Sequence, residues 1–211
     1  MVKALPMERR LELVSTVLLA LAAVATAWAA YQSRQWTGEQ SAGYSRATTA
    51  RLSENRAAAL ANRQVQIDVA TFIQWLDAQQ RHDGELAGFY RRRFRPEFQP
   101  AFAAWLATRP FSDAKAPETP FALPQYRLAA QARADGLEKT AAAASQSAKD
   151  ANQHADNAML AVVLFSLSLF FAGISAKLHS VRARAVILGL GCAVFLGALI
   201  WIASLPVRLT T

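Results

Sequence analysis

Three stretches of the chain carry no charged residue and approach the length needed to cross a lipid bilayer. They are residues 13–31, 158–176 and 185–205, and a membrane-spanning helix needs about 20 mostly apolar residues. The composition agrees with this, because 53% of the 211 residues are hydrophobic and only 18% are charged. The sequence therefore predicts an all-α integral membrane protein with three transmembrane helices.

The first stretch could also be a cleaved signal peptide, because basic residues precede it and Ala-x-Ala sequences occur near its end. We favour a retained helix, since the stretch is longer than a usual signal-peptide core and its alanine-rich pattern continues without a break. The basic residues then set the orientation: they lie in the tail, residues 1–12, and in the loop 177–184. Both segments are expected to be cytoplasmic. Residues 32–157 and the tail 206–211 are then expected to be extracytoplasmic.

The net charge of +8 does not point to nucleic acid. Six of the basic residues lie in the tail and the short loop, where they are expected to set membrane topology: Lys3, Arg9, Arg10, Lys177, Arg182 and Arg184. No nucleic-acid-binding motif is recognisable. Cys192, the single cysteine, lies within the third stretch, so no disulfide framework is expected and the extracytoplasmic region must be held by packing.

A repeat of small residues precedes the second stretch. Alanine or leucine fills both apolar positions of a heptad pattern over residues 137–158. We call its alanines the small-residue seam: Ala141, Ala144, Ala148, Ala151, Ala155 and Ala158. The count runs on as Val162, Phe165, Leu169 and Ala172, which predicts one helix over about residues 125–176. Its stalk part is residues 125–157 and its transmembrane part is residues 158–176.

Small side chains allow two helix backbones to approach closely, so the partner helix should also present small residues. Residues 32–80 contain such a series: Gly43, Ala47, Ala50, Ala57 and Ala61. We therefore expect a first helix over about residues 11–80 that pairs antiparallel with the seam, as in a coiled coil. If both helices cross the membrane surface at Tyr31 and Ala158, the numbers of facing residues sum to about 190. Arg34 should then face Asp156, and Glu39 should lie near Lys149.

The segment between the two stalk helices, residues 81–124, is rich in aromatic residues, arginine and proline. Gly84 and Gly88 are expected to weaken or end the first helix, and Pro96 and Pro100 to bracket the start of a short one. Its residues Phe98, Phe102 and Trp105 should share a face. The segments FRPEFQPAFAAWLATRPF and PFALPQY, followed by an alanine-rich helix and two close spans, resemble a group of uncharacterised bacterial three-span inner-membrane proteins with an extracytoplasmic helical domain. This resemblance implies a bacterial source and no functional residues.

The most distinctive chemistry of this segment is the sequence FYRRRFR, with Arg91, Arg92, Arg93 and Arg95 among aromatic rings. Guanidinium groups between rings can bind phosphate, an anionic polymer or the carboxylates of a protein partner. Alternatively, the arginines end a helix, where they favour its dipole and pair with Asp83, Glu85 and Glu97.

The sequence carries no recognisable catalytic, metal or cofactor motif. The three histidines are far apart along the chain, so we predict no enzyme activity, no cofactor and no metal. Gly189, Ala193 and Gly197 could pack within one chain or between subunits. Asn55 and Asn62 lie on a second face that could mediate self-association.

These features favour a non-catalytic, homo-oligomeric membrane scaffold or sensor that presents an extracytoplasmic helical domain. The alternative is an oligomeric passive ion channel with the stalk as its outer vestibule, because the apolar stretches lack the ionisable groups of active transporters. The expected partners are the lipid bilayer, further copies of the chain, and a protein or anionic partner at the segment 81–124. Nucleic acid is not among them.

Overall fold

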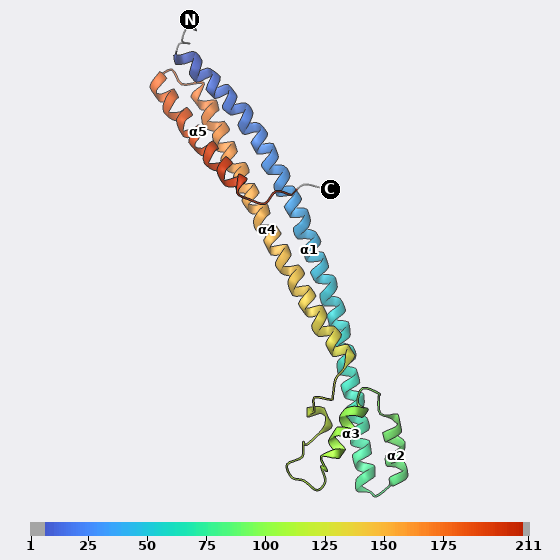
Figure 1. The fold of residues 1–211 in the computed structure, drawn as a ribbon. Coiled ribbons are helices and arrows are strands. Elements are labelled where there is room, and N and C mark those ends of the chain that lie inside the picture. Colours follow the sequence, from blue (N-terminus) through green and yellow to red (C-terminus); the bar gives the residue numbers. More distant parts are fainter. Residues whose placement is uncertain (1–6, 209–211) are drawn as a thin grey trace. The chain divides into compact units, whose positions relative to one another are not determined.

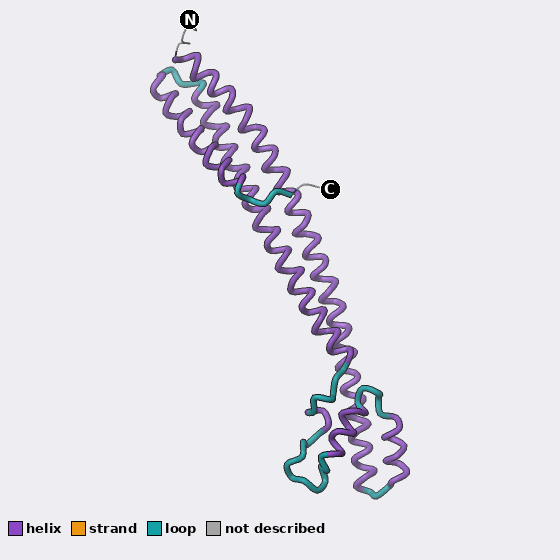
Figure 2. Tube along the Cα trace, viewed as in Figure 1, coloured by secondary structure: helices purple, strands orange, loops and turns teal. Residues whose placement is uncertain are grey.

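The computed structural model describes residues 7–208, and they form an all-helical structure without strands (Figures 1 and 2). Expectations for residues 1–6 and 209–211, including the topological role of Lys3, fall outside the described residues. Three helices are long and apolar enough to cross a membrane. The elements are α1 (Met7–Gln80), α2 (Gly84–Arg93), α3 (Gln99–Ala107), the 3₁₀ turn η1 (Pro120–Ala122), α4 (Ala129–Ser175) and α5 (Val181–Ala203).

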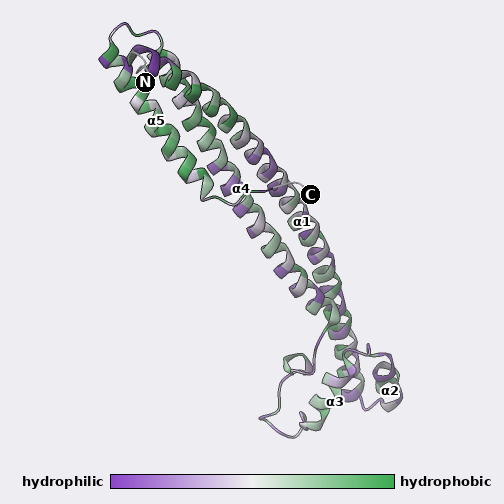
Figure 3. Cartoon of the chain, turned by 45° about the horizontal axis from the view of Figure 1, so that its top comes forward, coloured by the Kyte–Doolittle hydropathy of each residue, from purple (hydrophilic) through white to green (hydrophobic). Residues whose placement is uncertain are grey.

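The chain divides into two compact units. Unit 1 is Met1–Ser45 with Ala144–Thr211, and unit 2 is Arg46–Ala143. The described part of unit 1 is a bundle of three helices from α1, α4 and α5, and its residues are predominantly apolar (Figure 3). Its core alternates small and large side chains: Leu18, Ala22, Ala29, Ala161, Phe165, Ala172, Leu188, Phe195 and Ala198.

The antiparallel register expected for α1 and α4 is present in unit 1. The Ser33 hydroxyl donates to the carbonyl of Ala155 at 3.1 Å, and the Gln40 amide donates to the side-chain oxygen of Asn152 at 2.8 Å. The closest approach is at Gly43, where an added Cβ would lie 2.8 Å from the Cβ of Ala148. Glycine is therefore favoured at this position, because Ala148 leaves too little room for a methyl group.

The C-terminal segment contributes an ion pair to this part of unit 1, because the carboxylate of Glu39 lies 2.6 Å from the guanidinium of Arg208. The segment after α5 reaches α1 through a reciprocal contact in which Gln32 donates to the carbonyl of Arg208 at 3.1 Å and accepts from its N–H at 3.0 Å. Sequence spacing alone did not predict that the C-terminal segment would supply this partner.

The heptad count is confirmed in the second apolar stretch at Phe165 and Ala172, which are buried. At its other two positions Val162 and Leu169 are only partly buried, whereas the preceding residues Ala161 and Ser168 are fully buried. The buried face turns because α4 packs against α5 as well as α1 in unit 1. An added Cβ on Gly191 of α5 would lie 3.1 Å from the Cβ of Phe171 and 3.5 Å from the Ser168 carbonyl oxygen.

Unit 2 contains the outer part of α1, the start of α4, and α2, α3 and η1 between them. Ala61 of α1 packs with Leu128 and Ala130. The aromatic face predicted for α3 is present, since Phe98, Phe102 and Trp105 are all buried. They form a cluster with Phe72 and Trp75 of α1.

Two helix boundaries in unit 2 differ from the expectations. Gly84 begins a new helix, α2, because the Asp83 carboxylate caps it by accepting from the N–H of Leu86 at 2.9 Å. The return helix α4 begins at Ala129 and not near residue 125. Residues 125–128 stay outside the helix, and the Tyr126 side chain of this segment bonds to Asp68 of α1.

Candidate functional site

The aromatic cluster of unit 2 supplies a rigid platform for its surface. Many of its rings meet edge to face, as in Trp75 with Phe102 at 4.7 Å between centroids and Phe94 with Phe102 at 4.8 Å. Such pairs add about 0.5–1.5 kcal/mol each beyond the burial of their area. The Trp105 indole N–H donates to the carbonyl of Pro117 at 2.7 Å, so the proline-rich segment is tied to the same core.

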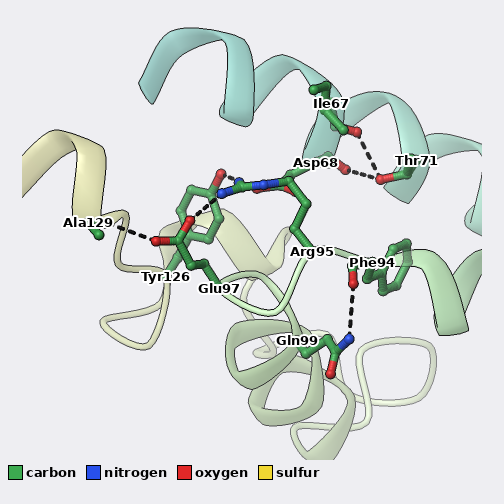
Figure 4. Close-up of polar contacts among 9 residues, drawn as sticks. All are labelled: Ile67, Asp68, Thr71, Phe94, Arg95, Glu97, Gln99, Tyr126 and Ala129. Carbon is green, nitrogen blue, oxygen red and sulfur yellow. Dashed lines mark hydrogen bonds and ion pairs between the residues drawn. The ribbon is translucent and has the colours of Figure 1, made fainter. Parts of the chain in front are cut away.

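A buried carboxylate joins the parts of unit 2. Asp68 is fully buried on α1, and its Oδ2 accepts from Arg95 Nη1 at 2.8 Å and from the Tyr126 hydroxyl at 2.9 Å (Figure 4). Arg95 also contacts the carboxylate of Glu97. Glu97 accepts in turn from the N–H of Ala129 at 3.0 Å, one of the otherwise unpaired donors in the first turn of α4.

Burial dominates the electrostatics of this network. Desolvation raises the pKa of Asp68 above its ordinary value, although the Tyr126 hydrogen bond and the charge of Arg95 oppose the change. Desolvation and the neighbouring Asp68 also raise the pKa of Tyr126, so the phenol remains a donor at neutral pH. Asp68 Oδ1 is buried and has no hydrogen-bond partner among the residues that the structure describes. The network therefore acts as a structural clamp that connects α1, the α2–α3 link and α4.

The structure separates the four arginines that the sequence grouped. Arg95 points into the clamp (Figure 4), and its side chain is only 19% exposed. Arg93 lies over the ring of Phe89, with 3.6 Å between the guanidinium carbon and the ring centroid. Arg91 and Arg92 are exposed in the last turn of α2, a favourable position relative to the helix dipole. Of the ion pairs expected with acidic neighbours, the one between Arg95 and Glu97 forms.

Arg91 and Arg92 line a surface groove of about 510 Å³ in unit 2. Phe94, Phe102 and Gln99 line the same groove. The Gln99 amide also donates to the carbonyl of Phe94 at 2.9 Å, which holds the α2–α3 link beside the groove (Figure 4). This surface, which we call the head groove, brings together two exposed arginines and two aromatic residues, an arrangement suited to an anionic group attached to an apolar body.

The other sequence-derived site residues fall into two groups. Five of the seam alanines are buried, namely Ala141, Ala148, Ala151, Ala155 and Ala158, and Ala144 is partly buried. Gly189, Ala193 and Gly197 are exposed on α5, and Asn55 and Asn62 are exposed on α1. A Cβ added at Gly189 or Gly197 would meet nothing within 4 Å, so this face does not pack within the described chain.

Sequence reasoning missed Asp68 and Tyr126. A signal for Asp68 was present, because it lies seven residues after the buried Ala61 and seven before the buried Trp75. A charged residue in a buried series requires a partner. Among the described residues there is no group of three or more histidine, cysteine or acidic side chains that could hold a metal ion. None of the protein-family models, curated proteins or solved structures compared with the chain matches it.

Proposed function

We propose that the chain is a non-catalytic inner-membrane scaffold or sensor that presents unit 2 outside the cytoplasm to an anionic partner. The observation that carries this proposal is the head groove, which Arg91 and Arg92 line together with Phe94 and Phe102. Unit 2 is tightly clamped around Asp68, so the groove is formed before a partner arrives. A preformed site loses less conformational entropy on binding.

The charge and aromatic distribution of unit 1 supports the membrane placement. Arg9 and Arg10 precede the apolar part of α1, and Trp28 and Tyr31 follow at its other end, with ring centroids 5.8 Å apart. Tryptophan and tyrosine favour the membrane–water interface. From Arg10 to Trp28 a helix rises roughly 27 Å, close to the hydrocarbon thickness of a bilayer. The basic end is placed in the cytoplasm by the positive-inside rule.

The proposed oligomer uses the face of α5 that carries Gly189, Ala193 and Gly197. The face is exposed, and its small side chains would let a second copy approach closely within lipid. Ala193→Leu is expected to lower the subunit number found for the protein in native-like nanodiscs. Val163→Leu is the matched control, because Val163 is 56% exposed on α4 and lies away from this face.

The partner site is tested by photo-crosslinking in intact membranes from a photoreactive residue at the exposed, groove-lining Ala103. A discrete adduct is expected that disappears in the Arg91→Glu, Arg92→Glu double variant. It should persist in Arg63→Glu, which reverses an exposed charge on α1 in the same unit. An adduct unaffected by the double variant would reject the head groove as the partner site.

A further inference from the structure

A second groove lies within the apolar part of unit 1, between α1 and α5. It has a volume of about 350 Å³, and every side chain that lines it is apolar or the thiol of Cys192. Val14, Val17 and Leu21 contribute from α1, and Cys192 and Leu196 from α5. We call it the α1–α5 groove. It opens on the outer face of the bundle, where Val17 is 55% exposed.

One end of this groove carries a cluster of positive charge. The helices α1 and α5 run parallel, because Glu12 pairs with Arg184 near their starts and Gly191 lies beside Leu18 further along. Arg9 and Arg10 in the first turn of α1 and Arg182 in the first turn of α5 are exposed. They therefore gather at the end of the bundle from which the groove begins.

Arg184 at this end retains hydrogen-bonding capacity. Its Nη1 is 3.7 Å from the carboxylate of Glu12, which is beyond hydrogen-bond distance. Its Nε is buried and finds no acceptor among the described residues. A buried guanidinium donor without a partner is unfavourable, so a small movement of the Arg184 side chain toward a phosphate oxygen would supply the acceptor that this donor lacks.

We propose that the α1–α5 groove binds an anionic phospholipid, with an acyl chain along Val14, Val17 and Leu21 and the phosphate at Arg184 and Arg10. The apolar groove and the cationic end together match the two parts of such a lipid. Basic sites between transmembrane helices on the cytoplasmic side are known binding places for anionic headgroups. The proposal rests on the membrane placement of unit 1 proposed above, and it adds a specific lipid to that placement.

The test is native mass spectrometry of the full chain released from membranes that contain equal amounts of phosphatidylglycerol and phosphatidylcholine. Retained phosphatidylglycerol is expected to exceed phosphatidylcholine. Arg184→Gln and, separately, Arg10→Gln should each reduce this preference about fivefold, which corresponds to about 1 kcal/mol per basic residue near the membrane surface. Arg34→Gln, an exposed arginine of α1 beyond Tyr31, is the matched control and should leave the preference unchanged.

A second pair of variants tests the groove itself. Val17→Trp fills the groove and should remove the retained lipid, whereas Val163→Trp adds the same bulk on an exposed part of α4 and should not. Equal retention of the two lipids, or equal effects of the two tryptophans, would overturn the proposal. A third outcome would also overturn the proposal: Val17→Trp lowers the subunit number but leaves the retained lipid unchanged. In that case a second copy of the chain, and not a lipid, would fill the groove.

Extraction with alkaline carbonate separates the two proposals. A chain that carbonate releases is not integral to the membrane, which would reject the membrane placement and the lipid site together. A chain that stays in the membrane but retains no phosphatidylglycerol would reject the lipid site alone.

Discussion

Replacing Gly43 with alanine tests the close approach of α1 and α4 most sharply, because a second glycine of the same helix provides a control. At Gly43 the new Cβ would lie 2.8 Å from the Cβ of Ala148, 3.1 Å from its Cα and 3.3 Å from its nitrogen. At Gly38 the same methyl group would meet nothing within 4 Å. Both changes gain the same helix propensity, about 0.8–1 kcal/mol.

The two variants should therefore change the stability of the protein in opposite directions. Overpacking a close contact costs about 1–3 kcal/mol. The cost at Gly43 should be in the upper part of that range, because two of the opposing atoms belong to backbone. Gly38→Ala should be more stable than the natural chain by about 1 kcal/mol, and Gly43→Ala less stable by about 1–2 kcal/mol.

Thermal unfolding of the full chain in detergent, followed by far-ultraviolet circular dichroism, measures this difference. A chain of this size shifts its midpoint by about 2–4 °C per kcal/mol, so the two variants should move in opposite directions by a few degrees. Adding Ala148→Gly to Gly43→Ala removes the shortest contact and should restore part of the loss. Equal stabilisation by both alanines would refute the close approach at Gly43.

Three further predictions concern the clamp around Asp68, the pH dependence of its stability, and ion conduction. Asp68→Ala leaves Arg95 without its buried partner, so unit 2 should lose about 3 kcal/mol, measured by urea unfolding with the fluorescence of Trp75 and Trp105; an unchanged midpoint would contradict the clamp. Folding raises the pKa of Asp68 above its ordinary value of 3.8, so the folded state binds more protons than the unfolded state. The contribution of Asp68 to stability should therefore be greatest below pH 3.8 and should fall as the pH rises through the pKa of Asp68 in the folded state. This dependence should be absent from Asp68→Asn. Purified protein in liposomes should carry no ion flux over a wide range of voltage and tension, and a reproducible conductance would favour the channel alternative.

The long helices and the register of α1 with α4 could be predicted from the sequence. Placing Tyr31 and Ala158 at the same level gave facing residues whose numbers sum to about 190, and the contacts of Ser33 with Ala155 and of Gln40 with Asn152 agree with this register. The buried face of α3 followed from the helical spacing of Phe98, Phe102 and Trp105.

Features that depend on a third segment could not be predicted in this way. The heptad count failed at Val162 and Leu169 because it considered one partner helix, and α5 is a second partner. Glu39 pairs with Arg208, which is distant in sequence and belongs to no repeat. These contacts arise where three segments pack together, and a count of residues between two helices does not predict where a third segment will pack.

The candidate site was predicted only in part. FYRRRFR indicated a cationic and aromatic surface, and Arg91 and Arg92 do line a groove over aromatic rings. Arg95 has the same chemistry but points inward, because the chain leaves α2 at Arg93 and turns the next arginine toward Asp68. Such a turn depends on backbone direction, which composition cannot supply. The capping residue Asp83 could have indicated α2, since aspartate is a preferred N-cap.

Disulfide formation between α1 and α4 in membrane vesicles is the most direct test of the helix pairing on which this account depends. Cys192, the only cysteine, is first replaced by serine, and cysteines are then placed at Gln40 and Asn152, whose side chains are 2.8 Å apart. The account predicts rapid cross-linking within one chain for this pair. It predicts little for cysteines at Gln40 and Gln146, which are out of register by roughly 9 Å. Equal cross-linking of both pairs, or cross-linking of the second pair alone, would contradict the account.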